Sequence, residues 1–270
     1  MKLSIVLSTH AARFQAVAFK GDFEANVARI ASYGYTGVEL AIRDPLLVDV
    51  GELEAVLAHR GLEAPAIGTG QAWGEERLSF TSDDPAVRSA AVARVISHVP
   101  LARRLRAVII LGLIRGITPP GQSHAQSMDY LVDALQSCAA AGEGVRFALE
   151  PLNRYETDLI HTVDQGLDLI QRVGAENFGL LLDTFHMNIE ESSIEASMRA
   201  AGDHIFHFHV ADSNRWHPGA GHLDFGSILG VLRRTGYTGY VSGEFMPMPD
   251  ADTGARRALQ HLRSVMRTID

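Results

Sequence analysis

Short apolar runs alternate with helix-like stretches along the whole chain, and this alternation limits the possible folds more than any other feature. The apolar runs predict strands at 3–8, 37–42, 64–69, 107–112, 145–150, 179–183, 205–210 and 239–244. Helices are predicted near 23–33, 51–60, 84–105, 123–141, 163–173, 192–201, 225–235 and 252–268. Eight such units in 270 residues predict an α/β fold, a (β/α)8 TIM barrel. A doubly wound open sheet is the competing architecture, but eight regular units favour closure.

The composition is consistent with one domain over residues 1–270 and argues against several classes of protein. Hydrophobic residues make up 46% of the chain, and no Pro/Gly/Ser-rich linker divides it. The formal net charge is −8 with no run of Lys or Arg, so a nucleic-acid partner is not expected. No apolar run approaches the ~20 residues that span a membrane, and the first residues resemble a strand rather than a signal peptide. We therefore expect a soluble, cytoplasmic protein without a membrane partner.

Four of the predicted strands end in a residue that can bind a hard metal ion. Glu150, Asp183, His209 and Glu244 close the last four apolar runs of the chain. One such residue has a simple explanation as a hydrogen-bonded strand end. Four in succession indicate a metal site, because the catalytic residues of such barrels lie at the C-terminal ends of the strands. The sequence therefore predicts a metal-dependent enzyme.

The two-residue period of a strand predicts where these side chains point. Phe147 and Leu149 face the surrounding helices, which turns Glu150 into the barrel. In the seventh strand, His207 and His209 share the inward face. His207 lies one layer deeper, and we interpret it as a hydrogen-bonded interior residue rather than a direct ligand.

Three carboxylates and one imidazole suit one hard or borderline divalent ion. Mn²⁺ is the first expectation, with Co²⁺ and Mg²⁺ as alternatives, whereas a structural zinc site would use thiolates. Such a site leaves positions for two substrate oxygens and can stabilise an enediolate. Glu150 and Glu244 are then the natural acid/base pair, one removing a proton and the other returning it to the opposite face. This chemistry is epimerisation.

The segments after these strands carry further polar groups. His186 and Arg215 lie close in sequence to the predicted ligands and favour a functional role. Arg154 is equally consistent with a structural ion pair.

At these residues the chain resembles the xylose-isomerase-like barrel superfamily, within it the ketose 3-epimerase group that includes D-tagatose and D-psicose 3-epimerases. The resemblance implies that Glu150, Asp183, His209 and Glu244 are the metal ligands and that Glu150 and Glu244 also transfer protons. It implies substrate-oxygen contacts for Glu156, His186 and Arg215. It also implies a homo-oligomer, a dimer or tetramer, and a small-molecule keto-sugar or keto-sugar acid as substrate.

Other segments look closer to the 5-keto-L-gluconate epimerases of bacterial inositol and uronate catabolism. They are residues 18–22, 38–45, 66–72, 150–158 and 183–191. This likeness implies inversion at the carbon next to the ketone of a keto acid of the 5-keto-L-gluconate or D-tagaturonate type. Such a substrate needs a partner for its carboxylate, and Arg115 with Gln71 is the first hypothesis, with Arg43 as another choice.

Several other functions are compatible with the same residues. The first alternative is a 3-epimerase of free ketoses such as D-tagatose, D-psicose/D-fructose or L-ribulose. A hydroxypyruvate isomerase-like or inosose dehydratase-like enzyme would carry a similar metal cluster. An AP endonuclease would need more ligands and a basic surface, and a non-catalytic sugar-binding barrel would not need the Glu150/Glu244 pair.

Overall fold

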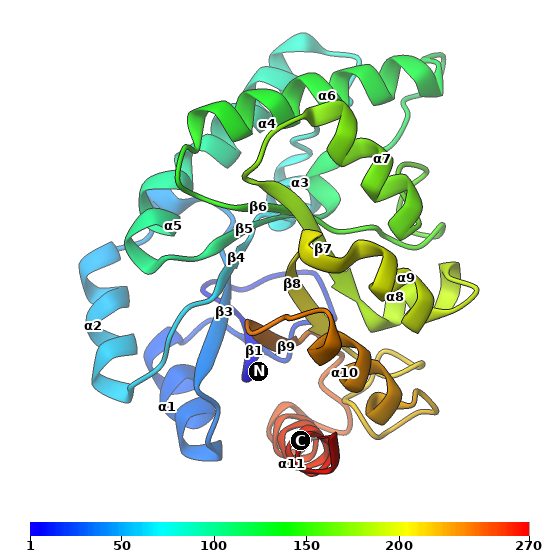
Figure 1. Ribbon diagram of the computed structural model, residues 1–270. Coiled ribbons are helices and arrows are strands. Elements are labelled where there is room, and N and C mark those ends of the chain that lie inside the picture. Colours follow the sequence, from blue (N-terminus) through cyan, green and yellow to red (C-terminus); the bar gives the residue numbers. More distant parts are fainter. Residues whose placement is uncertain (270) are drawn as a thin grey trace.

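The computed structural model describes residues 1–269 and shows a closed barrel of parallel strands surrounded by helices (Figure 1). The strands are β1 Lys2–Ser8, β2 Phe19–Lys20, β3 Gly37–Ala41, β4 Ala66–Gly68, β5 Val108–Leu111, β6 Phe147–Leu149, β7 Phe178–Asp183, β8 Ile205–Val210 and β9 Tyr240–Gly243. Strand β1 pairs with β3, each later strand pairs with the next, and β9 pairs back to β1. The predicted (β/α)8 barrel is confirmed.

The short strand β2 stands outside the eight barrel strands. It pairs with the C-terminal end of β1, through Leu7 with Phe19 and Ser8 with Lys20. The segment between β1 and β2 therefore lies at the C-terminal end of the barrel, where Phe14 and Val17 help to line a cavity. The sequence pattern did not predict this strand.

Most helices lie where they were predicted. They are α1 Phe23–Tyr33, α2 Val50–Arg60, α3 Gln71–Glu76, α4 Pro85–Ser97, α5 Val99–Leu105, α6 His124–Ala141, α7 Val163–Val173, α8 Thr184–Glu190, α9 Ile194–Ala201, α10 Phe225–Arg234 and α11 Ala251–Ile269. Three 3₁₀ turns, Pro45–Leu47, Leu113–Arg115 and Gly202–His204, complete the described elements. No helix among residues 1–269 is long and apolar enough to cross a membrane.

The helix predicted over 84–105 is wrong in one respect, because the structure divides it into α4 and α5 at His98. Pro100 occupies the first turn of α5, where its missing N–H costs nothing, whereas it would interrupt a continuous helix. The His98 ring bridges the junction through the carbonyl oxygens of Arg94 at 2.8 Å and Ile42 at 3.1 Å.

Two short helices, α3 after β4 and α8 after β7, lie at the C-terminal end of the barrel and were not predicted. Helix α8 begins immediately after β7, and the Asp183 side chain caps it by accepting the Phe185 N–H at 2.7 Å. The last residue of the strand is thus also the first capping residue of the helix, which fixes the direction of both.

The core has two layers, one between the strands and the helices and one inside the barrel. The inner layer is small and apolar, with Ala66, Ile110, Ala148 and Leu181 in contact. Phe147 and Leu149 belong to the outer layer, as the strand parity predicted. Polar side chains replace apolar ones inside the barrel above this plug, and these form the site described next.

Candidate metal centre and active site

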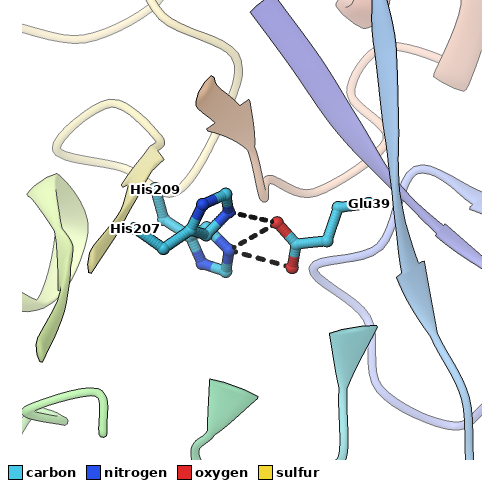
Figure 2. A group of neighbouring side chains, drawn as sticks. All are labelled: Glu39, His207 and His209. Carbon is cyan, nitrogen blue, oxygen red and sulfur yellow. Dashed lines mark hydrogen bonds and ion pairs between the residues drawn. The ribbon is translucent and has the colours of Figure 1, made fainter. Parts of the chain in front are cut away.

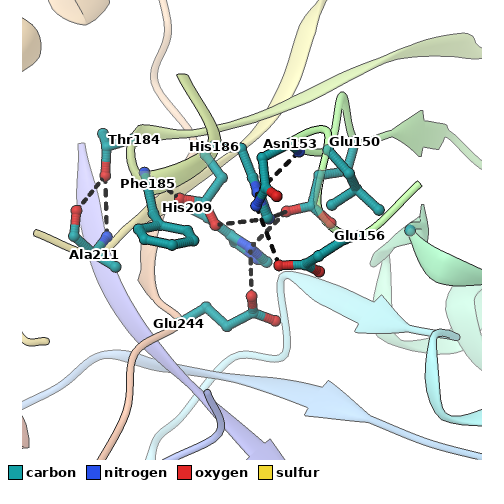
Figure 3. A network of polar contacts seen from close by, with 12 residues as sticks. Glu150, Asn153, Glu156, Thr184, Phe185, His186, His209, Ala211 and Glu244 are labelled. Atoms are coloured by element: carbon teal, nitrogen blue, oxygen red, sulfur yellow. Dashed lines mark hydrogen bonds and ion pairs between the residues drawn. The ribbon is translucent and has the colours of Figure 1, made fainter. Parts of the chain in front are cut away.

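Four side chains from the ends of β6, β7, β8 and β9 converge inside the C-terminal mouth of the barrel. Glu150, Asp183, His209 and Glu244 each offer one oxygen or nitrogen atom, and these atoms lie within 4.8 Å of one another. Figure 3 shows Glu150, His209 and Glu244 pointing toward one another. The Nδ1 atom of His209 is 3.7 Å from Oε1 of Glu150 and 3.9 Å from Oε2 of Glu244. These separations are too long for hydrogen bonds, but they suit atoms that share one ion at about 2.0–2.2 Å.

Unpaired buried atoms test whether this group suits a metal ion. Oε1 of Glu150, Oδ2 of Asp183 and Nδ1 of His209 are buried and have no hydrogen-bond partner among residues 1–269. Buried polar atoms are almost always paired, so three unpaired atoms facing one point need an external partner. The donor set of three carboxylates and one imidazole supplies the negative charge and oxygen atoms that a hard divalent ion prefers. The residues therefore fit a divalent metal.

His186 reaches the same point from helix α8. Its Nδ1 atom accepts from the side-chain N–H of Asn153 at 2.7 Å, which makes Nε2 the protonated nitrogen. Nε2 lies 3.7 Å from Oε1 of Glu150 and 3.9 Å from Oδ2 of Asp183 and has no other partner among the described residues. An N–H donor is thus aimed at the space beside the cluster, where it can bind a substrate oxygen.

Arg215 and Glu156 form the wall next to Glu244. The guanidinium of Arg215 donates to Oε1 of Glu156 at 2.6 Å and lies 3.5 Å from Oε2 of Glu244. It stacks against the rings of Phe14 and Phe185, with centroid distances of 5.2 and 4.7 Å. This contact fixes the guanidinium at the edge of the cluster, with its Nε atom unpaired.

The loop that carries Arg215 is held by the buried carboxylate of Asp212. That carboxylate accepts backbone N–H groups from Ser213 and Gly219 at 2.8 Å and from Leu223 at 3.1 Å. These bonds close the loop on itself after β8. Arg215 has a left-handed φ of 60° within it, a conformation that such a closed loop can maintain.

The two glutamates differ in their affinity for a proton. Burial raises the pKa of Glu244 to about 8, with the neighbouring Glu150 carboxylate adding to the effect. Burial also acts to raise the pKa of Glu150, but the His209 and His186 rings outweigh it and leave that pKa below its usual value. One carboxyl group therefore favours its protonated form and the other its ionised form, as an acid/base pair requires.

A cavity of about 280 Å³ opens onto these groups. Glu150, Glu156, His186, His209, Arg215, Glu244 and Gln71 line it, as do apolar side chains of the first half of the chain, including Val6, Phe14, Val17 and Ile110. Ligand pockets commonly begin near ~300 Å³, so the volume suits a small molecule. Gly112 also lines it, and a Cβ atom there would come within 3.1 Å of Oε2 of Glu150.

The structure separates the three side chains considered for a substrate carboxylate. Gln71 lines the cavity and donates to the Ser8 hydroxyl at 2.6 Å. Arg43 lies 3.4 Å from Glu75 and 3.3 Å from Glu76, outside the cavity lining.

The structure contradicts the hypothesis that Arg115 binds a substrate carboxylate. Its guanidinium is buried and donates only to backbone carbonyl oxygens, those of Gly112, Leu159, Ile160, Leu111 and Glu150. With its N–H groups used in this way and its side chain outside the cavity lining, Arg115 cannot grip a substrate carboxylate. It instead joins the end of β5 to the backbone of Glu150.

The sequence reasoning did not find Glu39, which lines the cavity from β3 and contacts His209. The signal that could have found it is the one used elsewhere, an acid inside a buried apolar run. His207 is a hydrogen-bonded interior residue, as interpreted, because its Nε2 atom is 2.7 Å from Oε2 of Glu39 inside the barrel.

Comparison with known proteins identifies the family of the chain. The model of the xylose isomerase-like TIM barrel family matches residues 27–265. The chain belongs to this family.

Relatives of this xylose isomerase-like barrel are enzymes that isomerise small molecules. It is 32% identical to the L-ribulose 3-epimerase of Methylomonas sp. (strain DH-1), over 85% of this chain and 82% of the relative. It is 30% identical to the hydroxypyruvate isomerase of Escherichia coli (strain K12), over 87% and 92%. The crystal structure of D-psicose 3-epimerase with D-tagatose, from Clostridium cellulolyticum H10, superposes with a TM-score of 0.84 at 26% identity, covering 98% of this chain and 99% of that one. The protein is therefore an enzyme.

Proposed function

We propose that the protein is a divalent-metal-dependent 3-epimerase of free ketoses. The observation that carries this proposal is the convergence of Glu150, Asp183, His209 and Glu244 with three buried, unpaired ligand atoms among them. Similarity to an L-ribulose 3-epimerase and a D-psicose 3-epimerase supports the choice of substrate. This preference departs from the keto acid that the sequence segments suggested first.

The chain's own residues supply the proton transfer. Glu150, which favours its ionised form, removes the proton from the carbon next to the ketone, and the bonding electrons move toward the carbonyl oxygen. Glu244, on the other side of the cluster, delivers a proton to the opposite face of the same carbon. His186 and Arg215 donate N–H groups to the substrate oxygens and hold the sugar between the two carboxyl groups. In the reverse direction the two glutamates exchange roles.

A divalent ion bound by Glu150, Asp183, His209 and Glu244 would polarise the carbonyl and stabilise negative charge on the substrate oxygens. Mn²⁺ is our first choice, with Co²⁺ and Mg²⁺ as alternatives, because the donor set is rich in oxygen.

The test is turnover with D-tagatose, D-psicose, D-fructose and L-ribulose in the presence of Mn²⁺, followed by identification of the product stereochemistry. In D₂O, we expect one deuterium at C3 of the product. Glu150 removes the original proton, and Glu244 delivers one that has exchanged with the solvent. Deuterium at C1 together with an aldose product would instead indicate an aldose–ketose isomerase. Turnover of hydroxypyruvate alone would favour the hydroxypyruvate isomerase alternative. No exchange with any of these substrates would refute the epimerase.

A keto-sugar acid is the second candidate substrate, and Arg13 is the observation that favours it. Arg13 lines the cavity from the segment between β1 and β2, and its guanidinium has no partner among residues 1–269. An arginine in this position can bind a carboxylate with two parallel hydrogen bonds. Replacing Arg13→Gln should raise KM for a keto acid and leave KM for a neutral ketose unchanged. An equal change for both substrates would contradict this candidate.

A further inference from the structure

Glu39 is a carboxylate buried inside the barrel, and no Lys or Arg among residues 1–269 pairs with it. It projects from β3 across the interior toward β8, and only 1% of its surface is exposed (Figure 2). Its partners are two imidazoles: Oε2 lies 2.7 Å from Nε2 of His207, and both oxygens lie 3.0 Å from Nε2 of His209. A buried carboxylate is retained only where hydrogen bonds satisfy it, and these are the bonds that do so.

This contact decides which nitrogen of His209 carries a proton. An ionised carboxylate only accepts hydrogen bonds, so the Nε2 atoms of both rings are donors. The remaining nitrogen of His209, Nδ1, is the buried atom without a partner that faces Glu150 and Glu244. The Nε2 bond to Glu39 therefore leaves the Nδ1 lone pair for a metal ion, and it also fixes the plane of the ring.

We propose that Glu39 is a positioning residue that orients His209 for metal binding. His207 has a supporting part, because its own bond to Oε2 holds the Glu39 carboxylate in place. A carboxylate behind a ligating histidine sets its tautomer and makes it a stronger donor, and loss of such a partner typically weakens metal binding by about 10–100-fold. The proposal rests on the metal site described above, but it concerns a residue outside the four proposed metal ligands.

One rival arrangement uses the same atoms. Glu39, His207 and His209 also bring three potential ligand atoms together, so a second ion could occupy that triangle. The separations of 2.7 and 3.0 Å are ordinary hydrogen-bond lengths, and each is explained by a proton on Nε2. A second ion would have to displace both protons, so the two arrangements differ in the number of ions bound per chain.

The first experiment compares Mn²⁺ binding by the wild type, Glu39→Gln and Glu54→Gln, using a competing chelator. The same substitution at Glu54, which bonds Arg104 at the opposite end of the barrel, is the matched control. We expect one ion per wild-type chain, binding weakened about 10–100-fold in Glu39→Gln, and unchanged binding in Glu54→Gln. The reason is that a glutamine amide carries no negative charge, and its NH₂ group donates where the second carboxylate oxygen accepted from Nε2 of His209. Wild-type affinity in Glu39→Gln, or two ions per wild-type chain, would overturn the proposal.

The second experiment needs no variant at Glu39 and so remains decisive if Glu39→Gln fails to fold. The nitrogen NMR signals of ¹⁵N-histidine enzyme loaded with Mg²⁺, assigned to His209 by its loss in His209→Gln, report which nitrogen is protonated. Protonated Nε2 and unprotonated Nδ1 are expected, and a protonated Nδ1 would overturn the proposal. If the wild type binds no divalent ion, the proposed metal-dependent function fails together with this inference. If it binds one ion that Glu39→Gln binds equally well, only the inference fails.

Discussion

The two ends of the barrel treat their polar groups in opposite ways. At the C-terminal end, side-chain atoms of Glu150, Asp183, His186, His209 and Arg215 are buried without partners. They account for five of the eight such atoms among residues 1–269, so unpaired polarity is concentrated in one place. A folded chain normally pairs its buried polar atoms, and an exception on this scale indicates a place prepared for a ligand.

At the N-terminal end, several polar groups pair with one another. Lys2 pairs with Glu63 at 2.6 Å, and the Tyr240 hydroxyl donates to the Thr36 carbonyl oxygen at 2.9 Å. A cavity of about 800 Å³, larger than the one above the cluster, opens here and is lined by Arg104 and Arg146 among others. The difference teaches that cavity size does not identify the site; unpaired, convergent donors and acceptors do.

The largest effect should come from the glutamates of the C-terminal end. We expect Glu150→Gln and Glu244→Gln each to lower kcat by about 10³-fold, because each removes a group that carries a proton. Steady-state kinetics measures this, with Glu190→Gln as control, since Glu190 only bonds the exposed Arg154 at the same end. A wild-type kcat in either Glu150→Gln or Glu244→Gln would contradict the conclusion that the C-terminal end of the barrel holds the active site.

The next largest effect should be structural and should come from Arg115. Replacing Arg115→Met removes its hydrogen bonds to buried backbone carbonyl oxygens, including those of Leu159 and Glu150, and we expect the free energy of unfolding to fall by about 3 kcal/mol. Urea denaturation measures the change. The preference between a keto acid and a neutral ketose should stay the same. A stable Arg115→Met variant that loses activity on keto acids alone would instead support the sequence-based hypothesis that Arg115 binds the substrate carboxylate.

Metal affinity should depend on pH, because metal binding must displace protons. Burial raises the pKa of Glu244 to about 8, and the pKa of His209 is raised well above its usual value because Glu39 and Glu150 outweigh the effect of its burial. Below pH 8 the Glu244 carboxyl group holds a proton that competes with the ion, and the raised pKa of His209 makes its imidazole also hold a competing proton more firmly than usual. Affinity should therefore fall as pH decreases from 8 to 6, by about tenfold per unit for each proton displaced. Titrations with a competing chelator at several pH values test this, and a constant affinity would contradict it.

The smallest effect should come from the N-terminal end. Arg104 bonds Glu54 at the surface, and an exposed ion pair of this kind contributes little. Arg104→Gln should leave kcat and Tm unchanged, as kinetics and thermal unfolding can check. A large loss of activity would show that this end takes part in function.

The sequence predicted the barrel well because each strand is a buried apolar run and most helices are long and periodic. It missed α3 and α8, which have six and seven residues, because so few residues do not produce a helical period. Their polar residues resemble those of a loop. Pro100 indicates the break between α4 and α5. The sequence alone did not show whether this proline begins a second helix or lies within one continuous, kinked helix.

The four strand-end residues were predictable because an acid or imidazole interrupts an apolar run, and strand parity shows its direction. Glu39 was missed because its partners, His207 and His209, lie about 170 positions away and only closure of the barrel brings them together. Arg115 was misassigned for the opposite reason. Arg115 follows the end of β5 closely in the sequence, which suggested that its side chain reaches the cavity. The sequence cannot reveal that backbone carbonyl oxygens surround its guanidinium.

The junction of β7 and α8 has a consequence for anyone who wishes to re-engineer this enzyme. Because one oxygen of Asp183 caps a helix and the other faces the cluster, one position serves both folding and chemistry. Asp183→Asn should separate them, since asparagine caps a helix as well as aspartate but brings no charge. Asp183→Ala should release the first turn of α8 and with it the orientation of His186. Libraries that aim to change metal preference should therefore vary this residue only among side chains that still cap the helix.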